Sequence, residues 1–282
     1  MTDRNLPMIP TTAPLSVSQN MPDFLRNMEG GIQGLENLDK SDFKLSELKL
    51  LQGGSPELDA FPGLAKKNEF WHTGLTKSFG PLVKSVIAVA RKRIILWRPK
   101  NDQGGGILAV SDDGSTWRMG GNKEFSVMLK GAKKPVTWCT GNNVVSSGLC
   151  EFGSSNPEDE NSAPAATMYY EYLLYLPEHE AGSPVLLRLK STGLDNGRAL
   201  NSYFIHLKKP IYAHVIDWIV EARSGNGNDW TVPKHVPAGW VDRNTFDLVA
   251  DMNKNYAEKM ADLAVEQEDD SVVVQDTNQP KY

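Results

Sequence analysis

Two apolar runs flank a basic trio in the middle of the chain and predict β-structure. Residues 82–90 read LVKSVIAVA and residues 94–97 read IILW, and both are rich in β-branched side chains. The trio Arg91-Lys92-Arg93 lies between them. The pattern predicts either two adjacent strands joined by a charged turn or one long strand that bends at the trio.

Further alternating segments predict a mainly β body. A glycine triplet precedes the apolar run ILAVS, and Asp113-Gly114 after it favours a hairpin turn. Residues 192–206 are expected to form a short helix. The other strand candidates are residues 125–129, 136–139, 168–176, 185–189, 211–222 and 230–236.

Near the C-terminus the spacing of the hydrophobic residues becomes that of a helix. Apolar side chains such as Phe246 and Val249 recur at three- and four-residue spacing, so residues 243–265 predict an amphipathic helix. Asp242 or Asn244 is expected to be its N-cap. The apolar stripe packs either on the protein's own sheet or against a second copy of the chain.

These elements divide the chain into four parts. The fold class is mainly β with inserted and C-terminal helices, arranged as an OB-like barrel or alternatively as a β-sandwich. The first part is rich in proline and glycine and is either a flexible arm or a segment that docks on a neighbouring subunit. The parts are the arm 1–44, the β-rich domain 45–241, the helix 242–265 and an acidic polar tail 266–282.

Charge is distributed unevenly along the 282 residues, whose net charge is -5. Residues 64–134 carry fourteen basic and five acidic side chains, a net +9, whereas the segments before and after them are acidic. Such a block attracts phosphate over the Debye length, about 8–10 Å in physiological salt. The alternative is that these cations only solvate one face of a sheet.

Composition and motifs exclude several classes of protein. No run reaches the roughly 18 apolar residues of a membrane-spanning helix, and two cysteines suit a reducing cytoplasm. The phosphate-loop, H-E-x-x-H and G-x-S-x-G motifs are absent. The histidines lack ligand spacing, and Cys139 and Cys150 alone do not make a zinc site. We therefore expect no catalytic residue, no metal, no cofactor and no membrane contact.

Aromatic side chains are interleaved with basic ones through the cationic block. Cations neutralise phosphates and indole rings stack on bases, a contact worth about 1–3 kcal/mol per base. The pattern predicts an open groove for single-stranded nucleic acid, unless the tryptophans are core residues. The predicted phosphate contacts are Lys84, Arg91, Lys92, Arg93, Arg98, Lys100, Arg118, Lys133 and Lys134, and the predicted stacking residues are Trp97 and Trp117, together with Trp71 or Trp138.

Several stretches are distinctive as strings. They are SPELDAF at 55–61, AKKNEFWHTG at 65–74, IILWRP at 94–99, GGGILAVSDDGSTW at 104–117 and GSSNPEDENSAPAATMYYEYLLYLPE at 153–178. Together they resemble a group of tailed-bacteriophage proteins of poorly assigned function, over roughly residues 45–240. Phage single-stranded DNA-binding proteins are similar in plan, with an OB-type barrel, a basic aromatic groove and an acidic C-terminal tail.

The sequence therefore predicts a non-catalytic single-stranded DNA-binding protein of phage replication or recombination, with residues 45–241 as the binding domain. The resemblance implies the host cytoplasm as its location. The acidic tail would recruit replication or recombination proteins, and a homo-oligomer is compatible with the sequence. Two alternatives from other classes remain: a virion component that decorates or assembles the capsid, and a nucleic-acid enzyme whose site is not recognisable.

Overall fold

The chain divides into two units, Met1–Phe43 and Lys44–Tyr282, and all described residues belong to the second unit. The predicted arm 1–44 and the predicted tail 266–282 lie outside the described residues. The computed structural model describes residues 45–97, 107–118, 124–127, 134–141, 143–156, 158–225 and 227–257.

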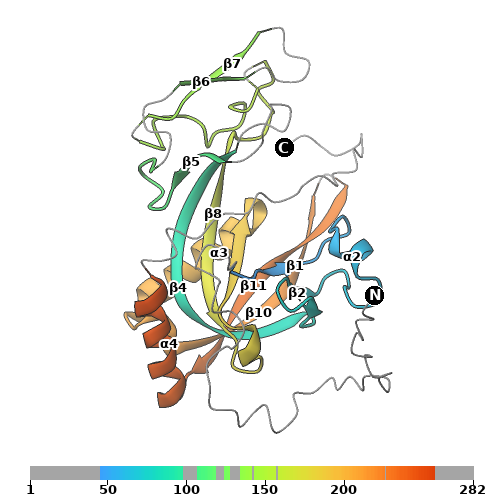
Figure 1. Cartoon of the computed structure of the whole chain (residues 1–282), viewed down its shortest axis with the longest axis vertical. Helices are drawn as coiled ribbons and strands as arrows, with labels where there is room; N and C mark the ends of the chain where they lie inside the picture. Colours follow the sequence, from blue (N-terminus) through green and yellow to red (C-terminus); the bar gives the residue numbers. More distant parts are fainter. Residues whose placement is uncertain are drawn as a thin grey trace, which may run out of the picture. The chain divides into compact units, whose positions relative to one another are not determined.

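A six-stranded antiparallel sheet forms the centre of this unit (Figure 1). The mainly β class with inserted and C-terminal helices is therefore confirmed. Five strands lie side by side in the order β11-β10-β4-β8-β9, and β5 pairs with the far end of β4. Their bounds are β4 Leu82–Trp97, β5 Ile107–Ser111, β8 Ala166–Tyr175, β9 Val185–Lys190, β10 His214–Gly225 and β11 Asn228–Trp240.

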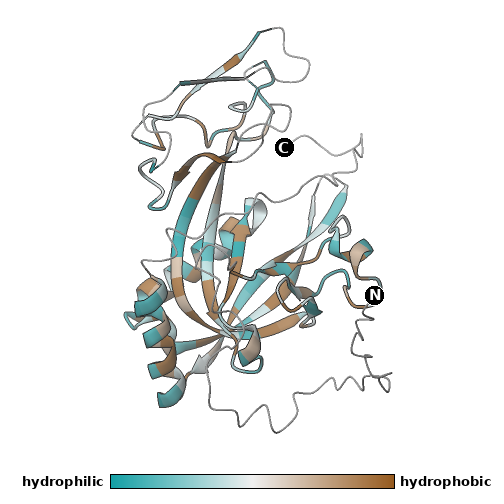
Figure 2. Ribbon diagram, viewed as in Figure 1, coloured by the Kyte–Doolittle hydropathy of each residue, from teal (hydrophilic) through white to brown (hydrophobic). Residues whose placement is uncertain are grey.

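The basic trio Arg91-Lys92-Arg93 lies within β4 and is not a turn. The two apolar runs form one strand of 16 residues, as the second of the two sequence interpretations predicts. In Figure 2 the trio is a hydrophilic band between two hydrophobic stretches of β4. The register with β8 shifts between Ile87 and Val89, so the strand has a β-bulge before the trio, whereas the sequence placed the bend at the trio itself.

Smaller elements surround the main sheet. Three short strands form a second sheet and two more form a separate hairpin. These elements are β1 Leu48–Leu50, α2 Glu57–Ala60, β2 Phe70–His72, β3 Lys77–Ser78, β6 Glu124–Val127, β7 Val136–Cys139, η2 Glu180–Gly182, η3 Ser191–Gly193, α3 Leu194–Leu207, η4 Ile211–Ala213 and α4 Arg243–Tyr256.

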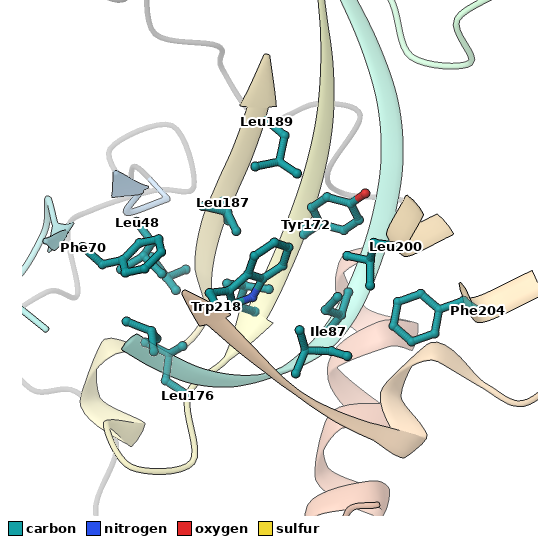
Figure 3. Packing of buried hydrophobic residues seen from close by; sticks show 14 residues of the cluster. Leu48, Phe70, Ile87, Tyr172, Leu176, Leu187, Leu189, Leu200, Phe204 and Trp218 are labelled. Atoms are coloured by element: carbon teal, nitrogen blue, oxygen red, sulfur yellow. The ribbon is translucent and has the colours of Figure 1, made fainter. Parts of the chain in front are cut away.

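The largest core lies between one face of the main sheet, helix α3 and the small sheet. Trp218 is fully buried near the middle of this cluster, between Phe70 of β2 and Leu200 of α3 (Figure 3). Its indole N–H donates to Ser85 Oγ at 3.0 Å, so the buried polar group is satisfied. Helix α3 comes close to the sheet at Gly197, where an added Cβ would meet the Tyr170 ring at 2.5 Å.

The opposite face of the sheet is covered by α4. Val249 is fully buried against residues of β4, β8 and β9, whereas the residues of α3 pack on the other side of β8. Hydrophobic and hydrophilic bands alternate along α4 in Figure 2. The predicted N-cap is confirmed, because the Asp242 carboxylate accepts from Thr245 N at 3.0 Å. The stripe therefore packs on the protein's own sheet, and residues 258–265 of the predicted helix lie outside the described residues.

The side of the sheet next to β11 is bridged by side chains. Gln52 mimics a neighbouring strand, because its Nε2 donates to Thr231 O at 2.9 Å and its Oε1 accepts from Thr231 N at 3.3 Å. Asn196 Nδ2 donates to Pro233 O at 2.9 Å. Among the described strands, β9 and β11 share no hydrogen-bonded register, so the sheet is not a closed barrel.

Asn253 of α4 anchors the helix at the bulge of β4. Its Nδ2 donates to Ala88 O at 2.7 Å, the carbonyl that the register shift places between the paired residues Ile87 and Val89. A buried carbonyl without a partner costs about 1–3 kcal/mol.

We expect Asn253→Ala to lower the free energy of unfolding by about 1–3 kcal/mol, because it leaves the Ala88 carbonyl without that donor. Urea denaturation measures the change. Asn255→Ala is the matched control, because Asn255 is an exposed residue of the same helix. Equal losses in the two variants would show that the anchor contributes nothing beyond helix propensity.

Candidate nucleic-acid interface

A row of charged side chains crosses three strands of the main sheet. Arg91 of β4 lies opposite Glu171 of β8, which lies opposite Arg188 of β9. Arg91 Nη2 is 2.6 Å from Glu171 Oε2, and Arg188 Nε donates to Glu171 Oε1 at 2.9 Å. Glu171 is fully buried, so one carboxylate holds two guanidinium groups in place. We call this row the arginine ladder.

A second row extends the ladder toward β5. Arg93 lies opposite Tyr169, which lies opposite Lys190. The Arg93 guanidinium is buried, with Nε 3.1 Å from Asp112 Oδ1, and Asp112 also accepts from Arg118 at 2.6 Å. Asp112 follows β5, so it joins the edge of the sheet to the ladder.

Carboxylates neutralise most of the charge of these two rows. Glu171 contacts Arg91 and Arg188, Asp112 contacts Arg93 and Arg118, and Glu47 also contacts Arg188. Burial and, after it, the neighbouring Arg91 lower the pKa of Arg93 to about 10, while Glu171 and Asp112 act in the opposite direction.

A rigid turn positions Asp112. The next residue, Asp113, accepts from the backbone N–H groups of Thr116 and Ser115 at 2.8 and 2.7 Å. These bonds, with those from the Thr116 and Ser111 hydroxyls, hold the pKa of Asp113 well below its ordinary value. The predicted hairpin signal at Asp113-Gly114 therefore forms a side-chain-capped turn at this place.

The cations predicted from the sequence have different surroundings. Lys84 lies near the start of β4, away from the trio, and pairs with Glu178 at 2.8 Å. Lys92 is half-buried near Gly114, while Arg118 and Lys134 are exposed. The predicted phosphate contacts that lie outside the described residues are Arg98, Lys100 and Lys133.

Three of the predicted stacking residues are core residues. Trp71, Trp117 and Trp138 have exposed fractions of 1%, 6% and 5%, so a base has no access to their ring faces. Trp71 packs beside Phe61 in one cluster, and Trp117 and Trp138 pack in another cluster at the far end of β4. The prediction that these indoles stack on bases is wrong, because each fills a small cluster around its own strand or loop.

Trp97 is the one predicted stacking residue that stays half-exposed in the structure. The expected single trough of cations and indoles is therefore not formed by the described residues of the predicted set. Among the predicted cations, Arg91 and Arg93 belong to the arginine ladder, and Arg118 contacts its carboxylate Asp112.

Sequence reasoning missed the partners of these arginines. Glu171 is the only acidic residue of the apolar segment ATMYYEYLLY, and Arg188 interrupts the run VLLRLK. A lone charge in a strand that is otherwise apolar indicates a buried ion pair, because an unpaired buried charge is costly. The sequence therefore indicated that Glu171 and Arg188 form buried ion pairs, but it did not indicate which strands supply the opposite charges.

A comparison with protein families matches residues 13–262 to the family described as Pam3 phage gp34-like protein. The chain belongs to this family. The resemblance to phage proteins is thereby confirmed at the level of the family, whose description names a phage gene product and no activity. Searches of curated proteins and of solved structures returned no match.

Two further findings concern the described residues of this phage protein. None of their helices is long and apolar enough to cross a membrane. Histidine, cysteine, aspartate and glutamate side chains form no group of three that could hold a metal ion in the part of the chain that the structure describes.

Glu171→Gln tests whether the ladder depends on its central charge. We expect a loss of about 3–5 kcal/mol in the free energy of unfolding, because Arg91 and Arg188 lose the carboxylate that compensates their buried charges. Urea denaturation measures the loss. The control Glu178→Gln removes the exposed pair with Lys84 and should cost about 0–1 kcal/mol. A Glu171→Gln variant as stable as this control would contradict the role of the ladder.

Proposed function

We propose that this phage protein binds single-stranded DNA without catalysis, in phage replication or recombination, through a domain with OB-type connectivity. The observation that carries the proposal is the order of strands in the main sheet. In chain order the strands are β4, β8, β9, β10 and β11, with α3 between β9 and β10. The first of these pairs with both the second and the fourth, and the fifth pairs with the fourth.

This connectivity supports an OB-type domain despite the missing closure. OB folds are five-stranded Greek-key barrels that are partly open, with the helix between the third and fourth strands. The gap between β9 and β11, where Gln52 and Asn196 bond to β11, would correspond to the open side of such a barrel. The short strands β1–β3 and β5–β7 are additions to this plan.

The connectivity also indicates where a ligand would lie. OB folds bind oligonucleotides across the second and third strands, between the loop after the first strand and the loop before the fifth. Here these are β8 and β9, the connection 98–165, and the connection 226–227 between β10 and β11. The arginine ladder crosses β8 and β9, and the exposed cations Arg118 and Lys134 belong to the connection.

Within this proposal the two kinds of cation have different roles. The ladder arginines already contact carboxylates, so they stiffen the three strands. Lys134 is exposed and can approach phosphate, whereas the Arg118 guanidinium already contacts Asp112. Trp97 keeps its predicted stacking role. The tail 266–282 keeps its predicted role of recruiting replication or recombination proteins.

Binding of fluorescein-labelled oligo-dT, measured by anisotropy at several salt concentrations, tests the proposal. We expect the affinity to fall steeply with salt, because each neutralised phosphate releases counterions and contributes about 0.7 to the logarithmic slope. Lys134→Gln should reduce the slope by about this amount, whereas Lys254→Gln, an exposed lysine of α4, should not change it. An affinity that is absent at low salt, or insensitive to salt, would contradict the proposal.

A second candidate function is a virion component that decorates or assembles the capsid. It is favoured by two strongly exposed apolar residues of the β7–β8 connection, Val145 and Phe152, with exposed fractions of 76% and 60%. Mass spectrometry of purified phage particles distinguishes the two. A DNA-replication protein should be absent at stoichiometric levels, and a stoichiometric amount would favour the virion component.

A further inference from the structure

Part of the main sheet is left uncovered on the side where α4 packs. Val86 of β4 and Val215 of β10 lie opposite each other and belong to the cluster under α4. Side chains alternate between the two faces of a sheet, so every second residue away from this pair lies on the same face. We call the next two rows across β4, β10 and β11 the open sheet face, which consists of Lys84, Asp217 and Val236 in the first row and Leu82, Ile219 and Lys234 in the second.

The middle of the open sheet face is aliphatic. Leu82 is 50% exposed and Val236 is 38% exposed. Ile219 lies opposite Leu82 on the neighbouring strand and is half-buried. A sheet face that meets water normally carries polar side chains, so exposed aliphatic groups at its centre indicate a contact with another surface.

One end of the open sheet face is acidic. Lys84 lies opposite Asp217 and donates to Glu178 at 2.8 Å. The hydrogen bond from Lys84 lowers the pKa of Glu178, so this carboxylate is ionised at neutral pH. Asp217 Oδ1 has no hydrogen-bond partner in the described part of the chain. These three side chains therefore include two carboxylates and one cation.

The other end is basic. Further along β10 and on the same face, Glu221 accepts from Lys234 at 2.6 Å and from Arg223 Nε at 2.8 Å. These side chains are two cations and one carboxylate, and the hydrogen bond from Lys234 is the main cause that lowers the pKa of Glu221. The nearby Asp229 lies opposite Ser224, the residue after Arg223, and therefore belongs to the other face.

The two ends are complementary to each other. In a two-fold dimer a surface meets its own copy, so a patch with a single sign of charge would repel itself. A two-fold axis that crosses β10 at Ile219, parallel to the sheet and perpendicular to the strand, places two sheets face to face with their β10 strands antiparallel. The acidic end at Asp217 of one copy then faces the basic end at Arg223 of the other copy, and the aliphatic side chains meet at the centre.

We propose that the open sheet face binds a second copy of this chain in a symmetric dimer. The aliphatic centre provides the contact area, and the two acidic–basic contacts fix the antiparallel orientation. A polyanion does not suit this surface, because its two ends together have as many carboxylates as cations. The inference goes beyond the proposed function and does not depend on it.

Sedimentation velocity of the full-length protein tests the dimer. A face of this size gives a weak interface, so we expect a reversible dimer with a Kd of about 1–100 μM. Leu82→Glu should raise the Kd about tenfold or more, because it places a carboxylate in the aliphatic centre beside its symmetry copy. The matched control is Ile205→Glu, which changes an aliphatic residue of α3 that is 72% exposed and should leave the Kd unchanged. Urea denaturation shows whether each variant is folded.

A charge exchange tests the orientation of the two copies and carries the comparison if Leu82→Glu does not fold. Lys234→Glu makes the basic end acidic and should weaken the dimer, because it then faces the acidic end of the other copy. Adding Glu178→Lys to the same chain exchanges the two ends and should restore the dimer. A purely structural role of Lys234 would not be rescued in this way, because its described partner is Glu221 and not Glu178.

Three results would overturn the proposal. The first is a wild type that stays monomeric at about 100 μM. The second is a Leu82→Glu variant that is folded and dimerises as well as Ile205→Glu, which would place the interface elsewhere. The third is a Lys234→Glu variant whose dimer is not recovered by Glu178→Lys.

Discussion

Strand β4 takes part in three of the four clusters of buried residues in the described chain. Its first half contributes Ile87 to the core below α3 and Val86 to the core below α4, and its second half contributes Ile94 to the cluster around Trp117 and Trp138. It also pairs with β5, β8 and β10. The bulge at Ala88 allows one strand to contribute to all three clusters. The register changes there, where the strand passes from one set of neighbours to the next.

The local pattern of hydrophobic and polar residues was sufficient to predict most strands and helices of the fold. The β-branched runs before and after the trio predicted β4, and the three- and four-residue spacing of Phe246 and Val249 predicted α4 with its cap at Asp242. Both signals lie within one element and depend only on hydrophobic period and capping chemistry. The bridge of Gln52 to Thr231 joins residues far apart in the chain, and no local pattern indicates it.

The candidate site was harder to predict for the same reason. A segment of net +9 is less cationic once its partners are counted, and Glu171 and Glu178, which contact Arg91 and Lys84, both come from outside that segment. The role of an aromatic residue is also ambiguous in the sequence. The same indole can pack in a core or stack on a ligand, and only its burial in the structure distinguishes the two roles. Here burial assigns Trp71, Trp117 and Trp138 to cores and leaves Trp97, Trp230 and Trp240 with open surface.

The bridging of β11 by amide side chains limits how this protein can meet other chains. Strands at the margin of a sheet invite pairing with a foreign strand, because their unpaired N–H and C=O groups act as a template. At Thr231 both groups contact Gln52, and at Pro233 there is no N–H while the carbonyl accepts from Asn196. This stretch of β11 is therefore closed to strand addition, and aggregation by edge-to-edge growth is suppressed there without a covering strand.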